Sequence, residues 1–103
     1  MATKQFAIDY IKKYLKEASN YNLKISQAIL FGSYAKDLQN RNSDIDVALV
    51  SDSFSDNPLQ NRKLLSPLSF KFHKIEPHFF TVKYFNENDT FVHEIKRTGI
   101  KIL

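Results

Sequence analysis

The sequence has no cysteine, only two glycines and three prolines, and no long hydrophobic run. The lack of cysteine excludes disulfides, thiolate nucleophiles and cysteine-based zinc sites, and it is compatible with a reducing compartment. No apolar run approaches the roughly 18 residues that a membrane-spanning helix needs. The N-terminal stretch MATKQFAIDYIKKY also lacks the apolar centre of a signal peptide. These absences predict a cytoplasmic protein that does not cross a membrane.

The length of 103 residues leaves room for a single domain, residues 1–103, with one modest core. Apolar residues make up 43% of the chain and charged residues 25%, which is typical of a folded protein. The net charge of +4 is mild, and the basic clusters are short. Nucleic-acid binding is therefore open but not favoured, and the basic excess would also attract a polyphosphate.

Hydrophobic periodicity predicts alternating helices and strands. Helices are expected at residues 5–18, from Pro58 to a break at Pro67, and from a cap at Asn88 or Asp89 to Gly99. Strands are expected at residues 24–31, 45–50 and 75–82, and Pro77 places the last of these at a sheet edge or a bulge. This order predicts an α/β (α+β) fold in which helices pack on one small mixed sheet.

The second strand begins with two carboxylates in the pattern Asp-x-Asp. Side chains alternate along a strand, so Asp44 and Asp46 point to the same face with Cα atoms roughly 6.5 Å apart. Two such carboxylates repel each other unless cations lie between them. Oxygen ligands favour Mg²⁺ or Mn²⁺, and phosphate oxygens would complete the coordination.

A Gly-Ser pair stands between the first two predicted strands. Gly32 and Ser33 end the apolar stretch of residues 28–31, and a short helical turn is expected through Lys36. Backbone N–H groups in such a turn, with the Ser33 hydroxyl, can bind an anion, and glycine lets a phosphate approach closely. Nucleotidyl transfer requires both hydrogen-bond donors for phosphate oxygens and ligands for the metal ions.

The segment FGSYAKDLQNRNSDIDVALV, residues 31–50, resembles the signature of the DNA polymerase β-like nucleotidyltransferase superfamily. The short chain resembles the minimal nucleotidyltransferases, a group that includes antitoxin partners of HEPN toxins. The resemblance is strongest over residues 29–50. It implies a polymerase β palm-like fold. A neighbouring reading frame that encodes a small helical protein with an Arg-x4-6-His motif would point to a toxin partner.

The resemblance also implies roles for individual residues. Gly32, Ser33 and Lys36 would contact the triphosphate of ATP, and Asp44 and Asp46 would bind the metal ions. Glu76, on the third predicted strand, would be a third metal ligand that also activates the acceptor hydroxyl. Asp37 departs from the family, which commonly has glycine at this position.

Three functions remain open at this stage. The first is an enzyme that transfers AMP from ATP to an acceptor hydroxyl, with a HEPN toxin as one acceptor. The second is an antitoxin that neutralises its partner by contact with little or no catalysis. The third is a nucleotide-binding regulator that lacks turnover. His78 is expected on the same strand face as Glu76, but a hydrogen-bonded structural histidine is at least as good an interpretation. The acceptor, the base preference and homo-oligomerisation are not determined by the sequence.

Overall fold

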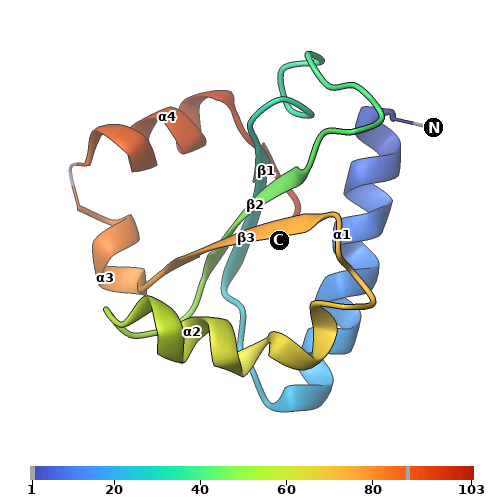
Figure 1. Ribbon diagram of the computed structural model, residues 1–103. Helices are drawn as coiled ribbons and strands as arrows, with labels where there is room; N and C mark the ends of the chain where they lie inside the picture. Colours follow the sequence, from blue (N-terminus) through green and yellow to red (C-terminus); the bar gives the residue numbers. More distant parts are fainter. Residues whose placement is uncertain (1, 88) are drawn as a thin grey trace.

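A mixed β-sheet forms the centre of the protein (Figure 1). The computed structural model describes residues 2–87 and 89–103. The strands are β1 (Gln27–Phe31), β2 (Ile45–Val50), β3 (Ile75–Phe80) and β4 (Ile100–Lys101), in the order β3-β2-β1-β4. β1 is antiparallel to both β2 and β4, whereas β2 and β3 are parallel. The predicted small mixed sheet is confirmed.

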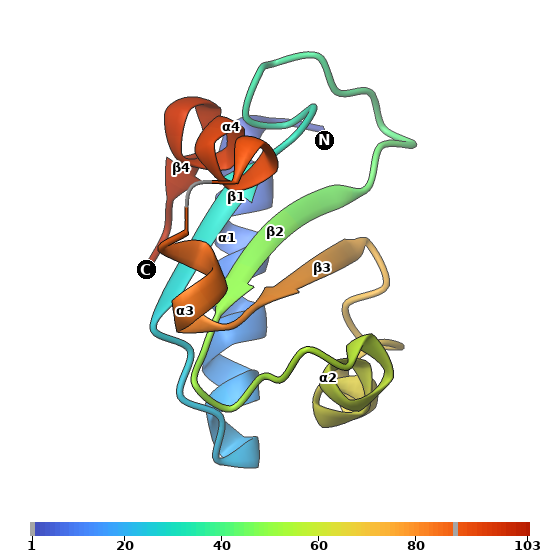
Figure 2. The same ribbon diagram turned by 90° about the vertical axis from the view of Figure 1, so that its left-hand side faces the viewer.

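The two faces of the sheet are covered by different helices (Figure 2). α1 (Lys4–Ala18) lies on one face, while α3 (Val82–Phe85) and α4 (Thr90–Thr98) lie on the other. α2 (Pro58–Leu64) and the 3₁₀ turn η2 (Ser66–Leu68) lie near β3, and a second 3₁₀ turn, η1 (Ser19–Tyr21), follows α1. Strand side chains therefore divide into two apolar clusters, one on each face.

The helices begin where short polar side chains can accept hydrogen bonds from free backbone N–H groups. Thr3 caps α1, Asn57 caps α2 with Pro58 in its first turn, and Asp89 caps α4. Asn88, the other expected cap of α4, lies outside the described residues. Pro67 falls in η2 after α2 has ended, as predicted.

The first and third observed strands are shorter than predicted, whereas β2 has the predicted bounds. The first begins at Gln27 instead of residue 24, and the third ends at Phe80 instead of residue 82. The third strand ends because the Thr81 hydroxyl accepts a hydrogen bond from the Tyr84 N–H at 3.0 Å and starts α3. Neither α3 nor β4 was predicted.

Pro77 lies on β3, which is an edge strand, as its presence predicted. The N–H groups of Ile45 and Ser51 donate to the carbonyls of Lys74 and Phe80, so the even-numbered residues of this segment direct their backbone groups toward β2. Backbone groups alternate in direction along a parallel strand, so the odd-numbered Pro77 directs its nitrogen toward the free edge of the sheet. No N–H donor is required there.

Several aromatic side chains belong to the core. Phe72, Phe80 and Phe85 are at most 8% exposed, whereas Phe70 is 92% exposed. In the described part of the chain, no helix is long and apolar enough to span a lipid bilayer.

Candidate active site

The Gly-Ser turn follows β1 directly. Gly32 has a φ of +75°, in the left-handed region that favours glycine. The Lys36 N–H donates to the Gly32 carbonyl at 3.2 Å, and the Leu38 N–H donates to the Ser33 carbonyl at 2.9 Å. The expected helical turn is therefore present, closed by its own backbone hydrogen bonds.

Gly32 is also in close contact with Asp46. β1 and β2 pair in a register that sets Phe31 opposite Asp46, so the turn begins beside this carboxylate. A Cβ atom at residue 32 would overlap the Asp46 carboxylate. The structure thus gives a second reason for glycine at residue 32, because the absence of a side chain there leaves space for the Asp46 carboxylate.

Asp46, Glu76 and His78 form a compact group of potential metal ligands. Their ligand atoms, one from each residue, all lie within 4.8 Å of one another. The parallel register pairs Asp46 with Glu76, and His78 follows two residues later on the same face of β3. His78 Nε2 lies 3.2 Å from Asp46 Oδ1.

Asp44 lies outside this compact group. It is exposed, immediately before β2, and it lines a cleft of about 590 Å³ together with Glu76 and His78. The Lys74 ammonium group donates hydrogen bonds to the carbonyls of Arg41 and Ser43, at 3.1 and 3.4 Å, and so fixes the loop that carries Asp44.

The cleft continues along β3 toward α2 and η2. Its wall includes the basic side chain of Arg62, the imidazole of His73 and the hydroxyl groups of Ser66 and Ser69. Tyr14 of α1 also lines it, and burial raises the pKa of the Tyr14 hydroxyl, which therefore stays protonated. Two of the three potential metal ligands, Glu76 and His78, thus line this cleft, whereas Asp46 does not.

Lys36 and Asp37 occupy the outer part of the turn. The Lys36 ammonium lies 3.9 Å from a carboxylate oxygen of Glu94 on α4, and both side chains are about half exposed. Asp37 has a φ of +58° and forms an ion pair with Lys4 at 3.0 Å. Asp37 thus has a left-handed backbone, a conformation that favours glycine.

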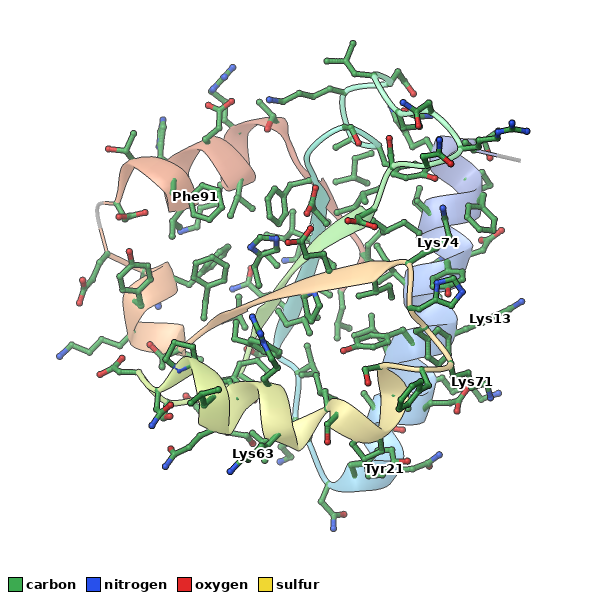
Figure 3. All side chains as sticks on the ribbon, viewed as in Figure 1. Lys13, Tyr21, Lys63, Lys71, Lys74 and Phe91 are labelled. Atoms are coloured by element: carbon green, nitrogen blue, oxygen red, sulfur yellow. The ribbon has the colours of Figure 1, made fainter. Side chains whose placement is uncertain are left out.

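The imidazole of His78 lies between aromatic rings. Its centroid is 4.8 Å from that of Phe31 and 6.3 Å from that of Phe91, both in edge-to-face geometry. Figure 3 shows Phe91 on α4, directed toward the sheet. Sequence alternation placed His78 on the face of Glu76, but its approach to Asp46 depends on the β2–β3 register, which the sequence did not provide.

The acidic side chains of α4 are held in their charged form. Hydrogen bonds from the Val92 N–H and then from the Tyr84 hydroxyl lower the pKa of Asp89 below its usual value. A hydrogen bond from the Arg97 guanidinium lowers the pKa of Glu94, and the charge of Lys36 adds to this effect. The N-terminal end of α4 is therefore fixed by a charged cap, and Glu94 stays charged and can pair with Lys36.

The donor atoms of the compact group fit a divalent cation. Carboxylate oxygens are the ligands that Mg²⁺ and Mn²⁺ prefer, and phosphate oxygens of a bound nucleotide would complete the coordination sphere. Asp46 is partly buried and Glu76 is exposed, so an ion bound by both would remain accessible from solvent, and Glu76 also lines the cleft.

Comparison with known proteins agrees with this geometry. Residues 10–103 match the family model described as "Polymerase beta, Nucleotidyltransferase", and the chain therefore belongs to this nucleotidyltransferase family. The predicted superfamily and its fold are thus confirmed. A search of curated protein sequences finds no match.

Two solved structures have a similar fold. One is a toxin-antitoxin structure with AMP-PNP, with a TM-score of 0.63 and 21% sequence identity. The other is a mutant of the MntA-HpeT toxin-antitoxin, with a TM-score of 0.61 and 19% identity. In both comparisons, the match covers 93% of this chain and 72% of the other chain.

Proposed function

We propose that this protein is a divalent-metal-dependent nucleotidyltransferase that transfers AMP from ATP to an acceptor hydroxyl. The convergence of Asp46 and Glu76, beside the turn that begins at Gly32, is the observation that carries the proposal. A bound Mg²⁺ or Mn²⁺ would neutralise phosphate charge and polarise the α-phosphate.

Each proposed site residue has a role in this reaction. Asp46 and Glu76 hold the metal, and Asp44 extends the set of carboxylates along the cleft. Gly32 and Ser33 bind phosphate oxygens at the turn, and Lys36 offers a positive charge if it leaves Glu94. The two groups are about half exposed and 3.9 Å apart, so breaking their ion pair costs little free energy.

The chemical step forms one bond and breaks one. The acceptor oxygen attacks the α-phosphorus, the bond from this phosphorus to the bridging oxygen of the β-phosphate breaks, and pyrophosphate leaves. The acceptor proton passes to Glu76, whose exposed carboxylate faces the cleft where an acceptor can approach.

The first acceptor to test is a partner toxin of the HEPN class. Support for this choice comes from the two similar structures, both of which are toxin-antitoxin structures, one of them with AMP-PNP. An acceptor on a second protein is also compatible with the open cleft beside β3.

A second candidate function is neutralisation of such a toxin by contact alone. Exposed apolar side chains on and after α2, namely Leu59, Leu64 and Phe70, favour a protein-binding surface. The two functions are compatible, because an enzyme that modifies its partner must also bind it.

The decisive experiment is incubation with ATP labelled at the α-phosphate, in the presence of Mg²⁺ or Mn²⁺, with and without the product of the neighbouring reading frame. The variants Asp46→Asn and Glu76→Gln remove metal-binding charge with little change in shape. Asp9→Asn, on the exposed surface of α1, is the matched control for loss of one carboxylate.

Label on the partner, lost in Asp46→Asn and Glu76→Gln but retained in Asp9→Asn, is the expected result. Metal-dependent ATP binding without any label, together with toxin neutralisation by the Asp46→Asn variant, would reject transfer and favour neutralisation by contact.

A further inference from the structure

The imidazole of His78 lies within reach of a metal ion held by Asp46 and Glu76. Its Nε2 is 3.2 Å from Asp46 Oδ1, and the three ligand atoms lie within 4.8 Å of one another. Adjacent ligands at about 2.1 Å from an octahedral ion are about 3 Å apart. The separation between His78 and Asp46 therefore fits two neighbouring positions around one ion.

The surroundings of His78 restrict the orientation of its ring. Phe31, whose side chain is almost fully buried at the end of β1, contacts the imidazole edge-to-face at 4.8 Å between centroids. Phe91 of α4 lies on a further side at 6.3 Å. The His78 side chain is 30% exposed, so it is neither buried in the core nor free in solvent. Packing of this kind prepares a ligand for binding, because less rotational freedom is lost when the metal binds.

We propose that His78 is a nitrogen ligand of the catalytic metal and that it shifts the preference of the site from Mg²⁺ toward transition ions such as Mn²⁺. Mg²⁺ strongly prefers oxygen ligands, whereas first-row transition ions accept imidazole readily. This inference rests on the proposed function, because it concerns the same metal site. It adds a specificity that a site made of carboxylates alone would not have.

A purely structural role for His78 makes a different prediction. A histidine that only donates a hydrogen bond to Asp46 would orient this carboxylate for any metal. Its removal would then weaken Mg²⁺ and Mn²⁺ binding by the same factor. A direct nitrogen ligand affects Mn²⁺ more strongly, and the ratio of the two affinities distinguishes the two roles.

The test measures Mn²⁺ binding to the full chain by electron paramagnetic resonance, without nucleotide or partner. Pulsed measurements on bound Mn²⁺ detect the ¹⁴N nucleus of a directly coordinated imidazole. The variants are His78→Gln and His78→Asp, the second of which replaces nitrogen with oxygen. His73→Gln is the control, because His73 lines the same cleft but lies outside the group of ligands. Circular dichroism establishes that each variant is folded.

The proposal predicts a ¹⁴N signal in the wild type and in His73→Gln that is lost in both His78 variants. The ratio of Mn²⁺ to Mg²⁺ affinity should fall about tenfold or more in His78→Asp. The proposal is wrong if wild-type protein binds Mn²⁺ without a ¹⁴N signal, does not bind Mn²⁺, or keeps its affinity ratio after substitution. Since no ATP is turned over, these outcomes are separate from failure of nucleotidyl transfer.

Discussion

Gly32 and Asp46 are coupled residues, because the space of the missing glycine side chain is occupied by the aspartate carboxylate. Gly32→Ala should reduce the free energy of unfolding by about 2 kcal/mol or more, since it adds steric overlap to an unfavourable positive φ. In an Asp46→Ala background, the same change should cost only about 1 kcal/mol, because backbone strain alone remains. Urea unfolding of the four proteins measures this coupling, and equal costs in both backgrounds would contradict it.

Asp37 presents a related case, with a φ of +58° in a residue other than glycine. Asp37→Val should be less stable than Asp37→Gly by about 1 to 2 kcal/mol, because a β-branched side chain is disfavoured in the left-handed region. Both changes remove the ion pair with Lys4, so the difference between their unfolding free energies reports the backbone preference at residue 37. The two unfolding midpoints give the answer, and a more stable valine variant would show that the turn has another conformation.

Predictions for single residues succeeded where a local pattern carried the information. The helical turn after Gly32 was predicted from adjacent residues and is present, with Gly32 in the left-handed region. The overlap of a residue-32 side chain with Asp46 could not be predicted, because it depends on how β1 pairs with β2. The placement of His78 against Asp46 depends in the same way on the parallel register of β2 and β3.

At the scale of elements, α4 depends on its N-cap residue, Asp89. The pKa of Asp89 is lowered by hydrogen bonds from the Val92 N–H and the Tyr84 hydroxyl. The charged cap therefore contributes its full stability above the ordinary pKa of an aspartate, and that contribution is lost as the pH falls below this value. Asp89→Asn retains an acceptor for Val92 but does not titrate.

The difference in unfolding free energy between wild type and Asp89→Asn should therefore shrink or reverse as the pH falls from 7 toward 3, with the change concentrated near pH 4 and below. Chemical unfolding at several pH values measures this difference. A difference that is independent of pH would show that the carboxylate charge does not stabilise the cap.

The elements themselves were predicted where periodicity was strong. α1 and β2 agree with the sequence pattern within one residue. The buried positions of α1 recur with helical spacing, and β2 is a short, almost continuously buried apolar run. α3 was missed because Thr81 and Val82 also continue the strand pattern of β3, and only the Thr81 cap ends it. β4 has two residues, too few for a periodic signal, and forms only because β1 has a free edge beside it.

At the scale of the whole molecule, the site is built from three strands that are distant in sequence. β1 supplies the turn, β2 supplies Asp46, and β3 supplies Glu76 and His78, while α3 and α4 cover the same face of the sheet (Figure 2). Two carboxylates so close together repel each other, and a bound cation would relieve this repulsion. The proposed function therefore predicts opposite effects of one substitution in the absence and presence of ligand.

The most direct measurement is the free energy of unfolding of wild type and Asp46→Asn, with and without Mn²⁺ and a non-hydrolysable ATP analogue. Without ligand, we expect Asp46→Asn to be as stable as the wild type or more stable, because charge repulsion is relieved. With ligand at a hundred times its dissociation constant, the wild type should gain about 2.7 kcal/mol and the variant much less. An equal gain in both proteins would contradict the assignment of Asp46 to a metal-nucleotide site.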